Sequence, residues 1–201
     1  MNSIYQIKPW FQKQLQPIVN LLHKLGITPN MITLLAIILS IAFAWLITAN
    51  NQLVIWLPAV LLIRMMLNAI DGMLAKQFQL QSALGEILNE LGDIISDIAL
   101  YIPLGAIFHF PSWPALAFIL LVIINEFSGV LAKAMTGTRR YDGPMGKSDR
   151  AFVFSIGAIV LITFPTSVMY LSYLVYVFII TIAWGTFNRL QFIIKHQSGK
   201  K

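Results

Sequence analysis

The sequence contains no cysteine and little charge. The absence of cysteine excludes disulfide bridges and thiolate metal sites. Only 11% of the residues are charged, whereas soluble domains carry about 25%, so the composition excludes an ordinary soluble domain. Acidic residues are the scarcer charged type, with 8 against 14 lysines and arginines. Because acidic residues are so few, their positions are informative.

Long apolar runs take the place of charge, and 58% of the residues are hydrophobic. A helix of about 20 apolar residues crosses the hydrocarbon core of a bilayer, which is roughly 30 Å thick. The fifth run is the shortest, and Pro165 ends it. We therefore predict an all-α, polytopic membrane protein with six transmembrane helices, in a domain of residues 28–201. The six runs are 31–49, 53–70, 87–108, 115–135, 151–164 and 168–187.

Residues 1–27 form a separate amphipathic segment. Apolar residues recur there at steps of three and four, which places them on one helical face, and three lysines lie off that face. Such a juxtamembrane helix can lie in the membrane surface, with its apolar side toward the lipid and its lysines near anionic headgroups. It can also pack on the cytoplasmic ends of the bundle, and the sequence leaves both placements open.

Lysine and arginine mark one side of the membrane. They occur before the first run, after the last run and in alternate connections, whereas the connections around residues 50, 111 and 166 contain none. By the positive-inside rule, both termini are cytoplasmic. The net charge of +6 is then a topology signal. Because the basic residues are spread over several segments, we expect no nucleic-acid partner. We expect an integral protein of a bacterial inner (cytoplasmic) membrane, surrounded by membrane lipids.

Five of the eight acidic residues fall between Asp71 and Asp97. On the third predicted helix, four of them lie within about 60° of one another. They are Glu86, Glu90, Asp93 and Asp97. On the second helix, Arg64, Asn68 and Asp71 share one face. A short polar turn joins the two helices, so we predict an antiparallel pair in which Asn68 and Asp71 lie at the depth of Asn89 and Glu90.

Ionised carboxylates inside a bilayer cost several kcal/mol, and clustered ones repel each other. Capping of the helix start explains Glu86 alone, because Asp93 and Asp97 lie about 10–17 Å further along the helix. A divalent cation in a water-filled cavity open to the cytoplasm is the simplest compensation. Oxygen ligands without cysteine or a nearby histidine favour magnesium, manganese or calcium over zinc.

The stretch NAIDGMLAKQFQLQSALGEILNELGD, residues 68–93, resembles the signature of the CDP-alcohol phosphatidyltransferases. That signature reads Asp-x2-Asp-Gly-x2-Ala-Arg, then about eight residues, then Gly-x3-Asp-x3-Asp. The matching positions are Asp71, Gly72, Ala75, Gly85 and Asp93. Asn68 and Asn89 stand where the family has aspartates, and Lys76 stands where it has arginine. The stretch TPNMIT, residues 28–33, also resembles the family's entry into its first membrane helix.

The resemblance implies an integral-membrane enzyme of phospholipid biosynthesis. Such an enzyme moves a phosphatidyl group from CDP-diacylglycerol to an alcohol hydroxyl and releases CMP. The resemblance also implies a homodimer, two divalent cations (Mg2+ or Mn2+) and Asp93 as the general base. The implied metal ligands are Asn68, Asp71, Asn89 and Asp93. Because the two asparagines remove two negative charges, Glu90, which follows Asn89 on the same strip, is the candidate replacement ligand. The implied CDP-binding positions are Asn68, Asp71, Gly72, Ala75, Lys76 and Gly85. A second register, in which Asp93 and Asp97 are the paired aspartates, stays open.

Basic residues also collect in the loop of residues 137–150. They are Arg139, Arg140, Lys147 and Arg150. Positive-inside bias explains several of them, but their density beside a phosphate-transfer site predicts binding of the lipid phosphates or of the acceptor. Glu126, in the middle of the fourth helix, either faces the same cavity or makes a structural hydrogen bond.

Arg64 is the one basic residue well inside a predicted span, since Lys133 lies at the cytoplasmic end of the fourth run. A guanidinium there must face the bundle interior and find a partner. The register places Arg64 between Asp93 and Asp97, and we predict a structural ion pair with Asp97.

Two other functions remain open. Intramembrane acids also mark ion paths, so a divalent-cation or proton transporter is the alternative class. A transport path would continue to the outer side, whereas here the polar residues crowd toward the cytoplasmic half. A catalytically inactive family member is the other alternative, because two asparagines remove two negative charges. The sequence does not specify the acceptor alcohol.

Overall fold

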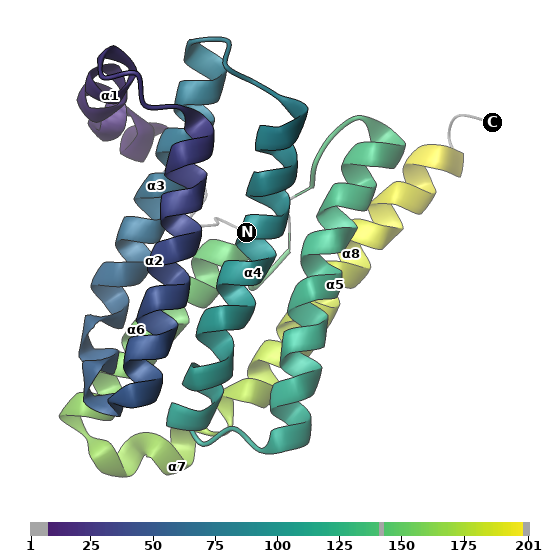
Figure 1. Ribbon diagram of the computed structural model, residues 1–201. Helices are drawn as coiled ribbons and strands as arrows, with labels where there is room; N and C mark the ends of the chain where they lie inside the picture. The colour runs from purple at the N-terminus through teal and green to yellow at the C-terminus, as the bar shows by residue number, and fades with distance from the viewer. Residues whose placement is uncertain (1–7, 141–142, 199–201) are drawn as a thin grey trace.

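The computed structural model describes residues 8–140 and 143–198, and these residues form helices and short connections (Figure 1). The first seven residues of the predicted amphipathic segment lie outside the described residues. The elements in chain order are α1 (Lys8–Lys24), α2 (Pro29–Ala49), η2 (Asn51–Trp56), α3 (Leu57–Gln77), α4 (Ala83–Ile107), α5 (Ser112–Thr136), α6 (Lys147–Thr163), η3 (Pro165–Ser167), α7 (Val168–Leu171) and α8 (Leu174–Ser198).

Local signals set the ends of these helices. Thr28 caps α2 by accepting a hydrogen bond from the Met31 backbone N–H, and proline occupies the first turn of the helix. Ser82 caps α4 in the same way through the Gly85 N–H, at 3.0 Å. At the other end of α5, Gly137 adopts a left-handed conformation with φ of 77°, a common helix terminator. These signals fix where α2 and α4 begin and where the basic loop leaves α5.

Four stretches of the described residues are long and apolar enough to cross a membrane: 29–49, 51–77, 112–136 and 165–197. α6 is shorter, with 17 residues, and α4 carries the four carboxylates of the acidic stripe. Both nevertheless lie alongside the other long helices in Figure 1. The protein is therefore an all-α, polytopic membrane protein, and the number of six crossings stays a prediction.

α2 lies between the two signature helices. It contacts both α3 and α4, while α5 pairs with α8, and α6 packs behind against α3 (Figure 1). Gly92 permits the approach of α4 to α2, since a Cβ at this position would lie 2.6 Å from Ile37 Cδ1. Because α2 holds α3 and α4 together, side chains rather than backbone contacts fill the space between those two helices.

α1 packs on the bundle. Leu15 and Val19 are buried against Leu74 near the end of α3, and His23 stacks on Phe78 with ring centroids 3.6 Å apart. Other apolar residues of α1 stay exposed, among them Leu21, which leaves an apolar side for the membrane surface. Both placements left open by the sequence are therefore compatible with this helix.

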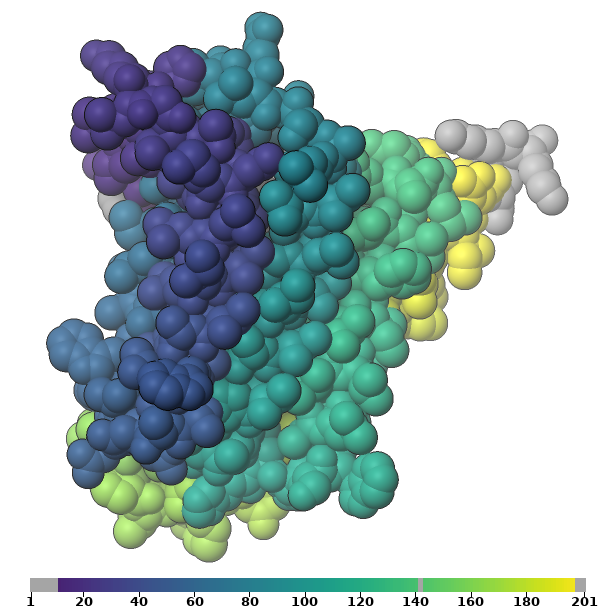
Figure 2. Space-filling view, in the orientation of Figure 1, coloured from purple at the N-terminus to yellow at the C-terminus, as the bar shows by residue number. Residues whose placement is uncertain are grey.

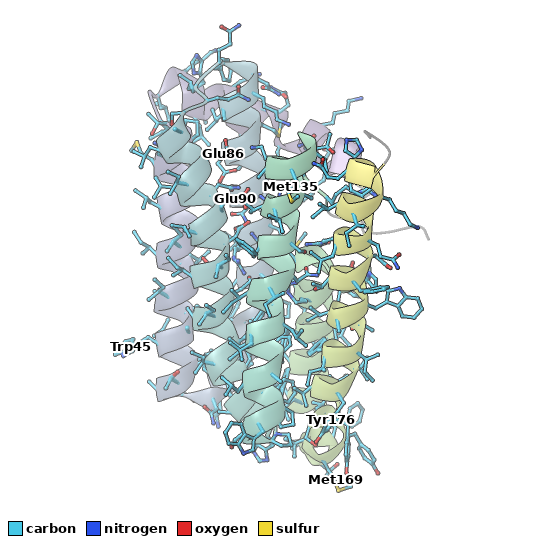
Figure 3. The ribbon with its side chains drawn as sticks, turned by 90° about the vertical axis from the view of Figure 1, so that its right-hand side faces the viewer. Trp45, Glu86, Glu90, Met135, Met169 and Tyr176 are labelled. Atoms are coloured by element: carbon cyan, nitrogen blue, oxygen red, sulfur yellow. The ribbon has the colours of Figure 1, made fainter. Side chains whose placement is uncertain are left out.

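An aromatic core closes the end of the bundle opposite to α1. Phe154 and Phe178 lie with ring centroids 5.0 Å apart, and Phe118 stacks on Phe178 at 5.2 Å. Tyr101 joins the same cluster from α4. Figure 3 shows Trp45, Met169 and Tyr176 toward this end, whereas Glu86 and Glu90 lie toward the other. The interior thus changes from polar to aromatic along the bundle.

The outer surface is apolar, as lipid requires. In Figure 2, α2, α4 and α5 form one continuous face of the molecule. Large apolar side chains of these helices are exposed there or around the bundle, including Ile38, Trp45, Ile102 and Leu116. Exposure of so many apolar side chains fits a hydrocarbon environment.

The sixth predicted run is interrupted in the structure. α7 ends at Leu171, and α8 begins at Leu174 and continues to Ser198, beyond the predicted end at residue 187. The Ser172 hydroxyl donates to the Met169 carbonyl at 2.7 Å, a local bond that favours a turn over a continuing helix. At its other end, Gln197 donates to the Met135 carbonyl at 2.6 Å, which anchors the extension of α8 to α5.

Candidate active site

The two halves of the signature meet through side chains of α3 and α4. Asn68 Nδ2 donates a hydrogen bond of 3.0 Å to Asp93 Oδ1. One turn away on α3, Arg64 Nη2 donates to the Asp93 carbonyl at 3.2 Å and lies 2.6 Å from Asp97 Oδ1. The prediction that Asn68 and Asp71 lie at the depth of Asn89 and Glu90 is therefore wrong for Asn68, whose side chain bonds Asp93, one turn further along α4. The interposed α2 sets this register, which a count along the two helices misses.

Asp71 is held from a third helix. Thr33 Oγ1 of α2 donates a hydrogen bond of 2.8 Å to Asp71 Oδ2. Both side chains are buried, and Asp71 is close enough to Asp93 for the two carboxylates to repel each other. Thr33 therefore orients one carboxylate at a place where a cation would relieve the repulsion.

The connection between α5 and α6 returns to these carboxylates. It crosses α8 where two glycines meet, because a Cβ at Gly143 would lie 2.7 Å from Gly185 Cα. A larger residue would push the loop outward from α8. Along this path, Lys147 at the start of α6 forms an ion pair with Asp93. A cation of the basic loop therefore touches the predicted general base.

Arg139 of the same loop lies beside Glu90, with which it forms an ion pair. Its Nη2 is also 3.5 Å from Glu126 Oε2, so the guanidinium bridges α4 and α5. The sequence predicts Glu90 as a metal ligand in place of Asn89. In the structure this carboxylate faces Arg139 instead, because the loop brings a cation to it.

Arg150 is fully buried between four partners. Its guanidinium donates to Asp97 Oδ2 at 2.7 Å, to Glu126 Oε1 at 3.0 Å and to the Tyr101 hydroxyl at 3.1 Å. It also donates to the Met145 carbonyl at 3.0 Å. Arg150 therefore locks the start of α6 to α4 and α5, and Glu126 makes a structural hydrogen bond.

Asp97 lies between two guanidinium groups. Arg64 approaches Oδ1 and Arg150 approaches Oδ2, and the Asp97 side chain is 1% exposed. Its charge is thus compensated without a metal ion. This geometry favours the register with Asp71 and Asp93 over the register that pairs Asp93 with Asp97.

The remaining predicted residues surround this centre. A Cβ at Gly72 would meet nothing within 4 Å, so space is open there beside Asp71. Gly85 instead packs against α2, since its Cβ would lie 2.7 Å from Asn30 Oδ1. Asn89 and Ala75 are half-buried, and Lys76 is exposed at the end of α3.

Two predicted polar residues lie at the edge of the centre. The guanidinium carbon of Arg140 lies 3.9 Å above the ring of Phe192. Glu86 pairs with Lys133 near the end of α5 (Figure 3). Arg140 is thus packed on Phe192 of α8.

The donor set can be tested against a divalent cation. The side chains that meet at the centre are the carboxylates of Asp71 and Asp93 and the amide of Asn68, and Asn89 lies one helical turn before Asp93 on α4. Hard oxygen donors of this kind suit Mg2+ or Mn2+, which retain waters and bind through one or two carboxylates. Among the described residues, no three histidine, cysteine or acidic side chains group closely enough to hold a metal ion. The set therefore fits one cation whose coordination is completed by substrate or water.

Sequence reasoning missed two partners in this centre. Thr33 holds Asp71, and Tyr101 holds Arg150. Thr33 lies within the TPNMIT stretch. Its hydroxyl, at the start of an apolar run, is the sequence feature that could have predicted a buried hydrogen bond. Nothing in the sequence distinguishes Tyr101 from the other aromatic residues expected in the core.

The comparison with protein families decides the class. The profile of the CDP-alcohol phosphatidyltransferases matches residues 26–187. The chain belongs to that family. As a CDP-alcohol phosphatidyltransferase family member, it is a membrane transferase of phospholipid biosynthesis, and the match covers all helices that contribute to the centre.

Two curated proteins resemble this family member along most of their length. The inner membrane protein YnbA of Escherichia coli is 41% identical over 196 residues, which cover 96% of each chain. An uncharacterized protein of Aquifex aeolicus is 28% identical over 162 residues, which cover 78% of this chain and 80% of the other.

Solved structures share the fold. The phosphatidylinositol phosphate synthase PgsA1 of Mycobacterium tuberculosis with CDP-DAG bound superposes with a TM-score of 0.72 at 22% identity, covering 88% of this chain and 92% of the other. The complex of PgsA1 with manganese and citrate gives a TM-score of 0.67 and covers 88% and 87%.

Proposed function

We propose that this protein transfers a phosphatidyl group from CDP-diacylglycerol to an alcohol hydroxyl, releasing CMP, at the cytoplasmic face of a bacterial inner membrane. One observation carries the proposal. Asn68 from the first half of the signature bonds Asp93 from the second half, beside the buried Asp71. Both halves of the signature therefore converge on one centre, near the open space at Gly72.

The relatives support the lipid donor, the divalent cation and the inner membrane in this proposal. PgsA1 is a phosphatidylinositol phosphate synthase seen with CDP-DAG and, separately, with manganese and citrate. YnbA is an inner membrane protein. The distribution of lysine and arginine supports cytoplasmic termini. The centre lies near α1, because Leu15 and Val19 of α1 pack with Ile70, Met73 and Leu74, on both sides of Asp71 in α3.

In the proposed reaction, the alcohol oxygen bonds to the phosphorus that carries diacylglycerol. The bond from that phosphorus to the CMP oxygen breaks, and the proton of the alcohol passes to a carboxylate oxygen of Asp93. Asn68 holds that carboxylate through its other oxygen, and Thr33 holds Asp71. A bound Mg2+ or Mn2+ would neutralise charge on the phosphate oxygens. Asp71, Asp93, Asn68 and Asn89 would hold it, and Glu90 would join them only by leaving Arg139.

The basic residues divide into two groups. Lys147 and Arg139 are partly exposed beside the centre, and we propose that they contact the phosphates of the donor or of the acceptor. Arg140, on the adjacent side of the loop, would contribute at longer range. Arg150 is fully buried and engaged by two carboxylates, so it serves mainly to hold α6 in place.

The aromatic core argues against a transport path. Beyond Asp97 the interior is occupied by Tyr101 and a cluster of phenylalanines, with no chain of ionisable groups among the described residues of that cluster. An ion crossing the bundle would have to pass this cluster without ligands.

Release of CMP tests the proposal. Purified protein would be incubated with CDP-diacylglycerol, Mg2+ or Mn2+ and a panel of alcohols: glycerol phosphate, inositol phosphate, amino alcohols and lipid alcohols. CMP released only when an alcohol is present supports phosphatidyl transfer. No CMP with any alcohol would contradict the proposal and favour an inactive family member.

A further inference from the structure

The two asparagines of the signature leave the site with half of the family's aspartates. The family resemblance implies two divalent cations among four aspartates, whereas here Asp71 and Asp93 are the aspartates that remain at those positions. Two dications bring four positive charges against these two carboxylates. Cations in two-metal sites lie about 3.5–4 Å apart, so bridging carboxylates are needed to offset their repulsion.

Protein donors already occupy part of both carboxylates. Asp93 Oδ1 accepts from Asn68 Nδ2 and pairs with Lys147. Asp71 Oδ2 accepts from Thr33. One oxygen of each carboxylate then remains to face a ligand, which is the number that one Mg2+ or Mn2+ takes from protein carboxylates.

Glu90 does not make up the missing charge. It forms an ion pair with Arg139, and that guanidinium also lies within 3.5 Å of Glu126. A move of Glu90 toward the metal would leave Arg139 with weaker compensation. Lys147 adds a further positive charge beside Asp93, which opposes a second dication.

We infer that the site binds a single divalent cation, with Asp71 and Asp93 as its charged ligands, and that the amide N–H of Asn68 also positions Asp93. This inference rests on the proposed function, because it uses the same centre. The amide N–H of Asn68 donates a hydrogen bond to Asp93. An aspartate at position 68 would repel Asp93, and a second cation between the two carboxylates would be needed to hold them together. Asn68 and Asn89 thus set the number of cations.

Mn2+ binding to the purified protein in detergent tests the inference without turnover. Free and bound Mn2+ would be counted by equilibrium dialysis with electron paramagnetic resonance detection. Binding would be measured with and without CMP, so that a cation requiring the nucleotide phosphate is also counted. Asp71→Asn provides the background. We expect one Mn2+ per wild-type chain above that background in both conditions.

The double variant Asn68→Asp/Asn89→Asp should bind two Mn2+ per chain. Asn51→Asp, on η2 at the far end of the bundle, adds charge away from the site and should leave the count at one. Two cations on the wild-type protein would overturn the inference and leave the proposed function intact. No cation above background would overturn both. A double variant that still binds one would show that the asparagines do not set the number.

Discussion

Thr33 of α2 holds Asp71 of α3 through a buried hydrogen bond of 2.8 Å. This contact joins the TPNMIT stretch to the signature, two segments separated by more than thirty residues. Because Asp71 is buried, its orientation depends on such a donor rather than on water. The contact places the first membrane helix among the elements that build the centre.

Thr33→Val should weaken Mn2+ binding by about 10- to 100-fold, as expected when a metal-ligating carboxylate loses its hydrogen-bonded support. Mn2+ titration of the two proteins measures the change. Thr48→Val is the matched control, because the Thr48 hydroxyl bonds only its own helix, at the Ala44 carbonyl. Equal Mn2+ affinities for Thr33→Val and wild type would show that Asp71 does not need this donor.

Because Asp97 pairs with two arginines, its loss should destabilise the protein more than the loss of one of them. Asp97→Asn leaves two buried guanidinium groups with weaker compensation and should lower the free energy of unfolding by about 3–5 kcal/mol. Arg64→Met should cost less, because Arg150 still pairs with Asp97. The double variant should cost less than the sum of the two. Unfolding in mixed micelles measures the cycle, and strictly additive losses would exclude a coupled pair.

Glu90→Gln separates the two roles open to Glu90. If this carboxylate serves Arg139, as the structure has it, Mn2+ affinity should stay within about threefold of wild type while the loop loses an anchor. Calorimetric titration with Mn2+ measures the affinity. A large loss of affinity, partly restored by adding Asn89→Asp, would instead show that Glu90 is a metal ligand.

The loop cations should fall into two classes. Lys147→Met and Arg139→Gln should raise the KM for CDP-diacylglycerol or for the acceptor, because both side chains contact the centre from the loop. Arg150→Met should mainly lower thermal stability, because it leaves two buried carboxylates with weaker compensation. Steady-state kinetics and thermal unfolding of the same preparations separate the classes. Unchanged KM values for the Lys147 and Arg139 variants would show that these loop residues do not bind the substrates and reflect only the positive-inside bias.

Much of this fold follows from the apolar runs, which predicted both ends of α2, α4, α5 and α6 to within four residues. α3 continues to Gln77, seven residues beyond its predicted end at residue 70. The break before α8 did not follow, because it depends on a local bond of Ser172 within an apolar run. In the centre, the spacing of Asp71 and Asp93 predicted their convergence. The partners of Arg139 and Lys147 were beyond prediction, because the path of their loop depends on the close contact of Gly143 with Gly185.

The most direct test of the account is CMP release by wild type and Asp93→Asn under identical conditions. Wild-type protein with CDP-diacylglycerol, Mn2+ and an accepted alcohol should release CMP. Asp93→Asn should reduce the rate by about 10²–10⁴-fold, because the amide cannot take the proton of the alcohol. Asp149→Asn, which changes only the capping carboxylate of α6 at Gly146, should retain activity. Undiminished CMP release by folded Asp93→Asn protein would contradict the assignment of Asp93 as the general base.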